Sequence, residues 1–299
     1  MTSDLMEHAK NSIFEHDDFA DWTVALFDNI LVLATSFDDL AIKLRRLLQR
    51  AQHFNLVLNA EKSNIGVSTI DFFGYTIAAG KISICDSRKK PIIDMAPPTS
   101  LTKMRTFLGL TNAFSAFTPG YSDALKPLYD TTSDTFTWPP ADIATEFSPV
   151  WSGPDGAIRL AAFNRIKRLI ADSLVMHFPD YSLDWTVRTD ASDFAVSGTI
   201  IQHRPHSTPG APSIPSLAII DSKISSVILP STEEVIYVFN QVLSDTASRW
   251  DVHKKEAYGI IATVRNYADI LWGKAFLLET DHANLRYMDN LIKVKFIKC

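Results

Sequence analysis

The chain has 299 residues, which at about 100–200 residues per domain predicts two domains. Hydrophobic residues make up 46% of it and charged residues 21%, as in ordinary globular proteins. The formal net charge of −5 argues against a strongly basic nucleic-acid binder, although a local basic groove can exist within an acidic total. Cys85 and Cys299 lie far apart and have no nearby Cys or His partners, which argues against a disulfide framework or a zinc site.

The N-terminal segment, residues 1–11, is polar and charged and has no apolar core, so we expect no secretory signal. Val24–Ala34 is the most apolar run, but it contains Asp28 and Asn29 and is too short to span a bilayer. Together with the low cysteine count, these features predict a cytoplasmic or nuclear protein without a membrane partner.

The residue patterns predict a mixed α/β (α+β) chain. Before residue 178 we expect hairpins within Val24–Ala34 and Phe72–Ile84, and helices after the caps Asp38-Asp39 and Ser100 and within Phe163–Leu174. A new domain is expected to begin at Pro179-Asp180. Its predicted elements are the strands Trp185–Asp190, Phe194–Ile201 and Ile236–Phe239, the helix Lys255–Leu271 and the strand Phe276–Thr280. The segment His203–Pro215 is expected to be a loop.

Three acids stand at the ends of these C-terminal elements. Asp190 ends the first strand, Glu256 lies in the first turn of the helix, and Asp281 follows the last strand. Hydrolysis of a phosphodiester by two metal ions needs carboxylates to bind those ions, and oxygen ligands favour Mg²⁺ or Mn²⁺. The alternative is that Asp190 and Asp281 simply end strands and that Glu256 stabilises a helix N-terminus.

Several short motifs follow one another through this domain: Thr189–Asp193, Ser244–Thr246, Arg249-Trp250, Lys255–Ile260, Trp272–Lys274 and Glu279–Leu285. In this order they resemble the ribonuclease H domain of gypsy-type LTR retrotransposon polyproteins. The resemblance implies a mixed five-stranded sheet flanked by helices, and cleavage of the RNA strand of an RNA–DNA hybrid. It also implies that Asp190, Glu256 and Asp281 are the catalytic acids, which bind Mg²⁺ or Mn²⁺. The family's fourth acid is not found before Cys299, which implies a C-terminally truncated domain.

The resemblance extends upstream. Phe27–Val32 stands where reverse transcriptases have the hairpin of the palm active site, Phe73-Gly74-Tyr75 resembles a later palm segment, and Met104–Leu110 resembles the thumb and connection. This implies a partial palm over residues 1–90, a helical thumb and connection over 91–178, and an RNase H-like domain over 179–299. Possible partners are therefore an RNA–DNA hybrid and the rest of a polyprotein.

Further candidate residues come from the resemblance and from the residue patterns themselves. Asp28 matches the first acid of the palm pair and is a candidate metal ligand, whereas Asn29 replaces the second acid; without the family, the pair is a plain turn. Arg88-Lys89-Lys90 are candidate phosphate contacts, or else a solvated charged surface. His282 could approach a substrate, or else be a surface group at a strand end.

These observations favour two functions over a third. The first is a metal-dependent nuclease acting on RNA–DNA hybrids within a reverse transcriptase fragment. The second is a catalytically inactive remnant that binds nucleic acid or a protein. The third, an integrase-type nuclease, disagrees with the upstream thumb-like motifs. Because Asn is a neutral and poorer Mg²⁺ ligand than Asp, we expect no DNA synthesis by this chain.

Overall fold

The computed structural model describes residues 19–26, 29–133, 135–139, 149–205 and 231–280. The chain divides into two compact units, residues 1–70 and 71–299. Helices and strands occur in both units, so the predicted α/β (α+β) class is confirmed. None of the helices in these ranges is long and apolar enough to cross a bilayer. The domain boundaries at residues 90 and 178 remain predictions.

The described part of the first unit contains an antiparallel hairpin and one long helix. Strands β1 (Thr23–Leu26) and β2 (Asn29–Val32) pair with Leu26 opposite Asn29, which confirms the predicted hairpin. Helix α2 spans Phe37–His53, and a short 3₁₀ turn, η2, spans Ala60–Lys62. The core of this unit consists of Phe19, Trp22 and Leu47, with apolar residues of the hairpin and helix around them.

The cap of α2 differs from the prediction. The helix is capped by Ser36, whose side chain accepts a hydrogen bond from the backbone N–H of Asp39 at 3.1 Å. Asp39 itself lies in the first turn, where it accepts hydrogen bonds from Thr35 and from Lys43, with 2.8 Å between Lys43 Nζ and the carboxylate. Asp38 and Asp39 therefore contribute charge near the positive end of the helix dipole, while Ser36 supplies the cap.

A small sheet begins the second unit. Its strand order is β3 (Thr69–Phe72), β4 (Tyr75–Ala78), β5 (Lys81–Ile84) and β6 (Met176–His177). The predicted hairpin within Phe72–Ile84 is confirmed by the antiparallel pairing of β4 with β5, whose turn contains Gly80 at φ +70°. Strand β6 was not predicted; its two residues pair with β5 although they lie far downstream in the sequence.

After this hairpin, the residues that the structure describes form four helices and three 3₁₀ turns. They are α3 (Asp86–Ile93), α4 (Leu101–Asn112), η3 (Ser115–Phe117), α5 (Tyr121–Tyr129), η4 (Asp130–Thr132), η5 (Pro149–Trp151) and α6 (Gly153–Ala171). Ser100 caps α4 as predicted, whereas α6 begins ten residues before the predicted Phe163. Their apolar faces form the largest core of the molecule's described part, in which Tyr121 donates a 2.8 Å hydrogen bond to Thr111.

The C-terminal sheet has the strand order β10-β7-β8-β9 within the described residues. Its strands are β7 (Asp184–Ala191), β8 (Ala195–Pro205), β9 (Ser231–Val242) and β10 (Phe276–Thr280). Strand β10 runs parallel to β7 and the other pairs are antiparallel, so the sheet is mixed as expected. The expected sheet has five strands; any strand beyond these four lies outside the described residues.

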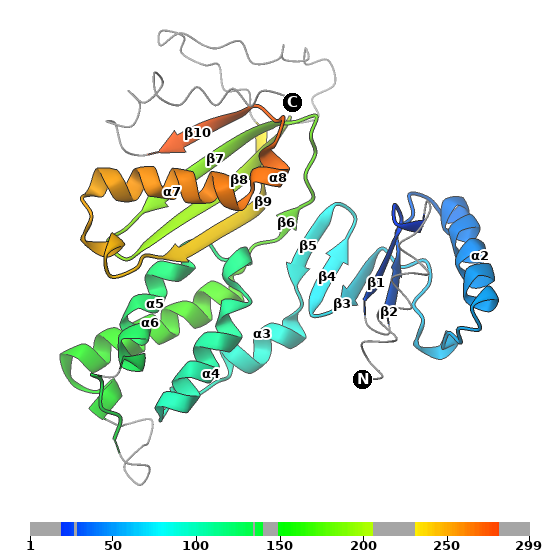
Figure 1. The fold of residues 1–299 in the computed structure, drawn as a ribbon. Helices are drawn as coiled ribbons and strands as arrows, with labels where there is room; N and C mark the ends of the chain where they lie inside the picture. The colour runs from blue at the N-terminus through cyan, green and yellow to red at the C-terminus, as the bar shows by residue number, and fades with distance from the viewer. Residues whose placement is uncertain (1–18, 27–28, 134, 140–148, 206–230, 281–299) are drawn as a thin grey trace. The chain divides into compact units, whose positions relative to one another are not determined.

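Helix α7 (Val252–Asn266) lies across one face of this sheet, after the 3₁₀ turn η6 (Ala247–Arg249) (Figure 1). A single helix was predicted as far as Leu271, but α7 ends at Asn266 and a short helix, α8 (Ala268–Leu271), follows. The break lies at Tyr267, whose hydroxyl donates a 2.8 Å hydrogen bond to the carbonyl of Val238 in β9. That tertiary contact is not visible in the helical periodicity.

Candidate active site

Asp190 is the second-last residue of β7 and is exposed to solvent. The residue before it, Thr189, is only 4% exposed, so Asp190 stands where the strand leaves the core. In β8 the residue opposite Asp190 is Ser197. The acid is therefore fixed by a regular ladder on a central strand rather than by a loop.

Glu256 lies near the N-terminal end of α7 and is only 3% exposed. Three residues further along, Gly259 lets this helix approach the end of β7 closely. A Cβ atom at Gly259 would lie 3.5 Å from the Val196 side chain and 3.8 Å from the carbonyl oxygen of Asp190. Because residues three apart share a helix face, Glu256 and Gly259 both lie on the face of α7 that contacts β7 and β8.

The third predicted acid follows β10. In the parallel pairing of β10 with β7, Thr280 lies opposite Thr189. Asp281 and His282 come directly after Thr280 and lie outside the described residues, as does Asp28 of the first unit. Across the described ranges, no group of three His, Cys, Asp or Glu side chains is arranged to bind a metal ion. The donor chemistry of Asp190 and Glu256, which offer carboxylate oxygens only, nevertheless suits Mg²⁺ or Mn²⁺.

A buried lysine beside Glu256 was not assigned a role from the sequence. Lys255 is 5% exposed, and its Nζ atom lies 2.8 Å from Oδ1 of Asp193, which belongs to the turn after β7. A lysine in the first turn of a helix opposes the helix dipole, so its burial there requires an acidic partner. The position of Lys255 near the start of the predicted helix is the sequence feature that could have indicated its ion pair with Asp193.

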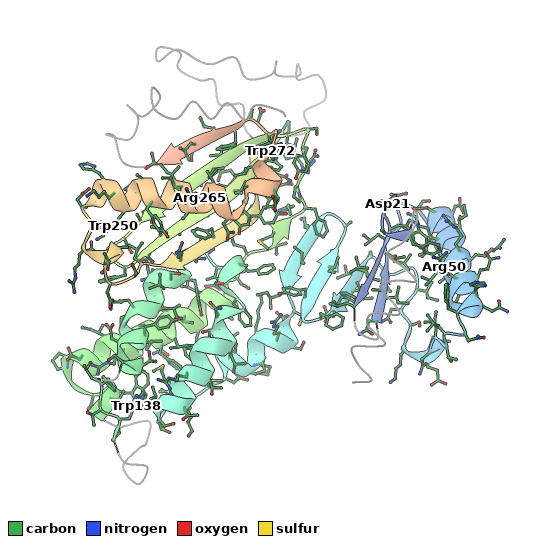
Figure 2. The ribbon with its side chains drawn as sticks, viewed as in Figure 1. Asp21, Arg50, Trp138, Trp250, Arg265 and Trp272 are labelled. Atoms are coloured by element: carbon green, nitrogen blue, oxygen red, sulfur yellow. The ribbon has the colours of Figure 1, made fainter. Side chains whose placement is uncertain are left out.

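The N-terminal end of α7 is also packed against aromatic residues. Trp250, which is labelled in Figure 2, lies two residues before the first residue of the helix. Its ring packs edge-on to that of Tyr258, with 5.5 Å between the ring centroids. Tyr258 accepts a 3.0 Å hydrogen bond from the Gln241 side chain in β9. Both contacts fix the helix end that contains Glu256.

A polar network lies at the opposite end of the same sheet. Glu234 is 8% exposed and accepts hydrogen bonds from Arg204 Nε at 2.8 Å and from Gln202 Nε2 at 2.7 Å. The hydrogen bond from Arg204 is the main reason that the pKa of Glu234 lies below its ordinary value. His177 lies 3.8 Å from Glu234, but burial lowers the pKa of its imidazole, so the contact is not an ion pair at neutral pH.

The candidate phosphate contacts lie in α3, which packs against α4 and α6. The Arg88 guanidinium lies over the rings of Tyr75 and Phe114, at 5.2 and 5.8 Å from their centroids. Lys90 is exposed and forms a 2.9 Å ion pair with Asp94, and Lys89 is half-buried. Arg88 thus has a packing role, and phosphate binding by these three residues remains a prediction.

Comparison with known proteins identifies the class of domain to which the C-terminal sheet and helix α7 belong. Residues 180–295 match the model of the RNase H-like domain found in reverse transcriptase. These residues therefore form an RNase H-like domain of the type found in reverse transcriptase, and the chain is similar in sequence to transposon and retroviral Pol polyproteins and in fold to a viral reverse transcriptase. This confirms the resemblance seen in the sequence, and the gypsy-type assignment is consistent with the transposon relatives.

Two curated relatives come from transposons of Drosophila melanogaster. The Pol polyprotein of transposon opus is 29% identical over 175 residues, which are 58% of this chain and 17% of the relative. That of transposon 297 is 23% identical over 264 residues, which are 88% of this chain and 21% of the relative. The chain therefore spans about a fifth of the length of these curated relatives.

Among solved structures, the foamy viral protease-reverse transcriptase in complex with dsDNA is similar, with a TM-score of 0.68 and 13% identity. The match covers 96% of this chain and 52% of that one. The same viral protein in complex with an RNA/DNA hybrid gives a TM-score of 0.62, also at 13% identity. At this identity the likeness establishes the fold.

Proposed function

We propose that this chain is a retrotransposon-derived reverse transcriptase fragment whose RNase H domain hydrolyses the RNA strand of RNA–DNA hybrids. The observation that carries the proposal is the in-register parallel pairing of β10 with β7. Thr189 and Thr280 are opposite each other, and each directly precedes an acid, Asp190 or Asp281. The C-terminal end of β10 therefore lies beside the residue that precedes Asp190 in β7.

In the proposed site, helix α7 contributes the remaining acid, Glu256. The close approach of Gly259 to the carbonyl of Asp190 supports the placement of Glu256 beside β7. Bound Mg²⁺ or Mn²⁺ would activate a water molecule and stabilise the charge on the leaving oxygen. Asp190, Glu256 and Asp281 are the proposed ligands, and the exposed position of Asp190 leaves that side of the site accessible to a hybrid.

The substrate and partners are part of the proposal. The similar viral enzyme was solved with dsDNA and with an RNA/DNA hybrid, which supports a hybrid as the substrate class. The relatives are polyproteins, so we propose that the chain functions as a segment of one. A cytoplasmic or nuclear location fits these roles and remains a proposal.

The test compares the wild type with Asp190→Asn on a hybrid with a labelled RNA strand, in Mg²⁺ and in Mn²⁺. Asp184→Asn is the matched control, because Asp184 is an exposed acid at the opposite end of the same strand. We expect wild type and control to cleave, faster with Mn²⁺, which accepts looser geometry. The rate of cleavage by Asp190→Asn should be lower by about 100-fold or more, because the substitution removes a proposed metal ligand.

Direct Mn²⁺ titration of the same three proteins separates metal binding from turnover. Equal cleavage by wild type and Asp190→Asn would place the activity elsewhere. Absence of cleavage by a folded wild type with either metal would reject the nuclease and leave the alternative, a catalytically inactive remnant that binds nucleic acid or a protein.

A further inference from the structure

The turn between β7 and β8 is organised by one hydroxyl group. Oγ of Ser192 accepts hydrogen bonds from the backbone N–H groups of Phe194 at 3.2 Å and Ala195 at 3.1 Å. The backbone N–H of Ser192 in turn donates to the carbonyl of Ala195 at 2.8 Å. Because Ser192 is two residues from Asp190, the conformation of this turn determines how the strand that carries Asp190 ends.

Helix α5 reaches this turn from outside the region that matches the RNase H-like domain. The Ser192 hydroxyl donates its proton to Oδ1 of Asp123 in α5. One turn further along the same helix, the Lys126 ammonium lies over the Phe194 ring, 5.7 Å from its centroid. Two residues on one face of α5 therefore contact two residues of the turn.

The helix that supplies Asp123 is rigidly packed. Tyr121, Leu125 and Leu128 on the other face of α5 are at most 2% exposed and belong to the helical core. A second link joins the same regions, since the Asn240 side chain in β9 donates to the carbonyls of Ser115 and Thr118 at 2.8 and 3.0 Å. Asp123 thus approaches the turn from a fixed position.

We propose that Asp123 is a positioning residue for the RNase H centre and acts through Ser192. A hydroxyl has one proton and two lone pairs. With its proton directed to Asp123, Ser192 Oγ offers both lone pairs to the amides of Phe194 and Ala195. Without Asp123, the nearest other acceptor is the carbonyl of Ala195 at 3.3 Å, and turning the proton there misaligns the lone pairs.

The first test needs neither metal nor activity. Amide hydrogen exchange of Phe194 and Ala195 is measured in the wild type, Asp123→Ala and Asp123→Asn, with Asp172→Ala as control. Asp172 is an exposed acid at the end of α6, in the same unit. We expect about three- to ten-fold faster exchange in Asp123→Ala, the effect of one hydrogen bond. Asp123→Asn keeps an acceptor oxygen and should restore most of the protection. Unchanged exchange in Asp123→Ala would overturn the proposal.

The second test rests on the proposed function. Cleavage of the hybrid is measured for Asp123→Ala, Ser192→Ala and the double variant. We expect kcat to fall about three- to ten-fold in each single variant with little change in KM, and no further loss in the double variant. Additive losses, or an equal loss in Asp172→Ala, would show that Asp123 does not act through Ser192.

A failure of the proposed nuclease function can be distinguished from a failure of the role proposed for Asp123. If the wild type does not cleave, the proposed nuclease is rejected, and amide exchange still decides whether Asp123 orders the turn. If Asp123→Ala does not fold, Ser192→Ala and Asp123→Asn decide. Ser192→Ala must increase exchange of both amides, and Asp123→Asn must keep most of the wild-type protection and kcat, because it retains an acceptor oxygen. Failure of either expectation overturns the proposal.

Discussion

The Nζ atom of Lys255 lies 2.8 Å from Oδ1 of Asp193, and this ion pair joins the first turn of α7 to the turn that follows β7. Its two members differ in environment, since the Lys255 side chain is 6% exposed and that of Asp193 is 76% exposed. Removal of either partner therefore leaves a different group behind. Loss of the acid leaves a buried ammonium, whereas loss of the lysine leaves a hydrated carboxylate.

We predict that Asp193→Ala destabilises the protein more than Lys255→Met does. An unpaired buried charge costs about 1–3 kcal/mol. An exposed carboxylate without its partner costs little, about 0–1 kcal/mol, and Met preserves the packing of the lysine stem. Urea unfolding of both variants measures the difference, and a larger loss in Lys255→Met would contradict this account of the pair.

Gly198 in β8 permits the close packing of α7. A Cβ atom there would lie 2.2 Å from Oγ1 and 2.4 Å from Cγ2 of Thr263, which is fully buried. We predict that Gly198→Ala lowers the free energy of unfolding by about 1–3 kcal/mol through overpacking. Gly109→Ala is the control, because it lies in α4 with open space around it and should stabilise by about 0.5–1 kcal/mol. Equal effects of the two substitutions in chemical denaturation would refute the packing argument.

The stability of the sheet end near β6 should decrease as the pH falls. Burial, together with the nearby Lys81 and Arg204, lowers the pKa of His177 below its ordinary 6.5. As the pH falls, His177 is therefore protonated in the unfolded chain before it is protonated in the folded chain, which favours unfolding. The pKa of Glu234 also lies below its ordinary 4.5, so its contribution is present above that pH and lost below it. We predict that His177→Gln reduces the loss of stability below pH 6.5. Glu234→Gln should reduce the loss of stability below pH 4.5. Urea midpoints across this range test both, and slopes identical to wild type would disprove the assignment.

We predict that the purified chain does not extend a primer on a template. Asn29 lies at the start of β2, and the sequence resemblance predicts that it replaces the second acid of the palm pair. Asn is a weaker Mg²⁺ ligand than Asp. Extension of a labelled primer, followed with Mg²⁺ and with Mn²⁺, is the measurement, and Asn29→Asp is the companion variant. Measurable synthesis by the wild type would contradict the prediction, whereas synthesis only by Asn29→Asp would identify Asn29 as the limiting residue.

The elements that sequence patterns predicted well are those whose cause is local. The antiparallel strands β7 and β8 and the short β10 appear where β-branched and aromatic residues cluster. The turn at Gly80 needs a positive φ, which glycine adopts without strain. Asp190 was placed near the end of its strand correctly. Glu256 was predicted in the first turn of a helix beginning at Lys255, but α7 begins three residues earlier, at Val252, so Glu256 follows the first turn.

The missed features depend on distant partners. Strand β6 exists because Met176 and His177 pair with Ile82 and Lys81. A segment of two residues is too short to show the alternation that predicts a strand. The partners in the Asp123–Ser192 and Lys255–Asp193 contacts are 69 and 62 residues apart in sequence. Local periodicity contains no information about such pairs, which arise only when α5 and α7 dock on the sheet.

The pairing of β10 with β7 has a consequence for biosynthesis. Arg188 and Glu279, which face each other across these strands, are 91 residues apart, whereas β8 follows β7 almost immediately. At about 5–20 residues per second, a ribosome needs roughly 5–20 s to deliver β10 after β7 has emerged. During that interval β7 has one unpaired edge, which is open to pairing with other chains. Nascent molecules are therefore most vulnerable to aggregation and to chaperone capture in this interval, before the parallel strand closes the sheet.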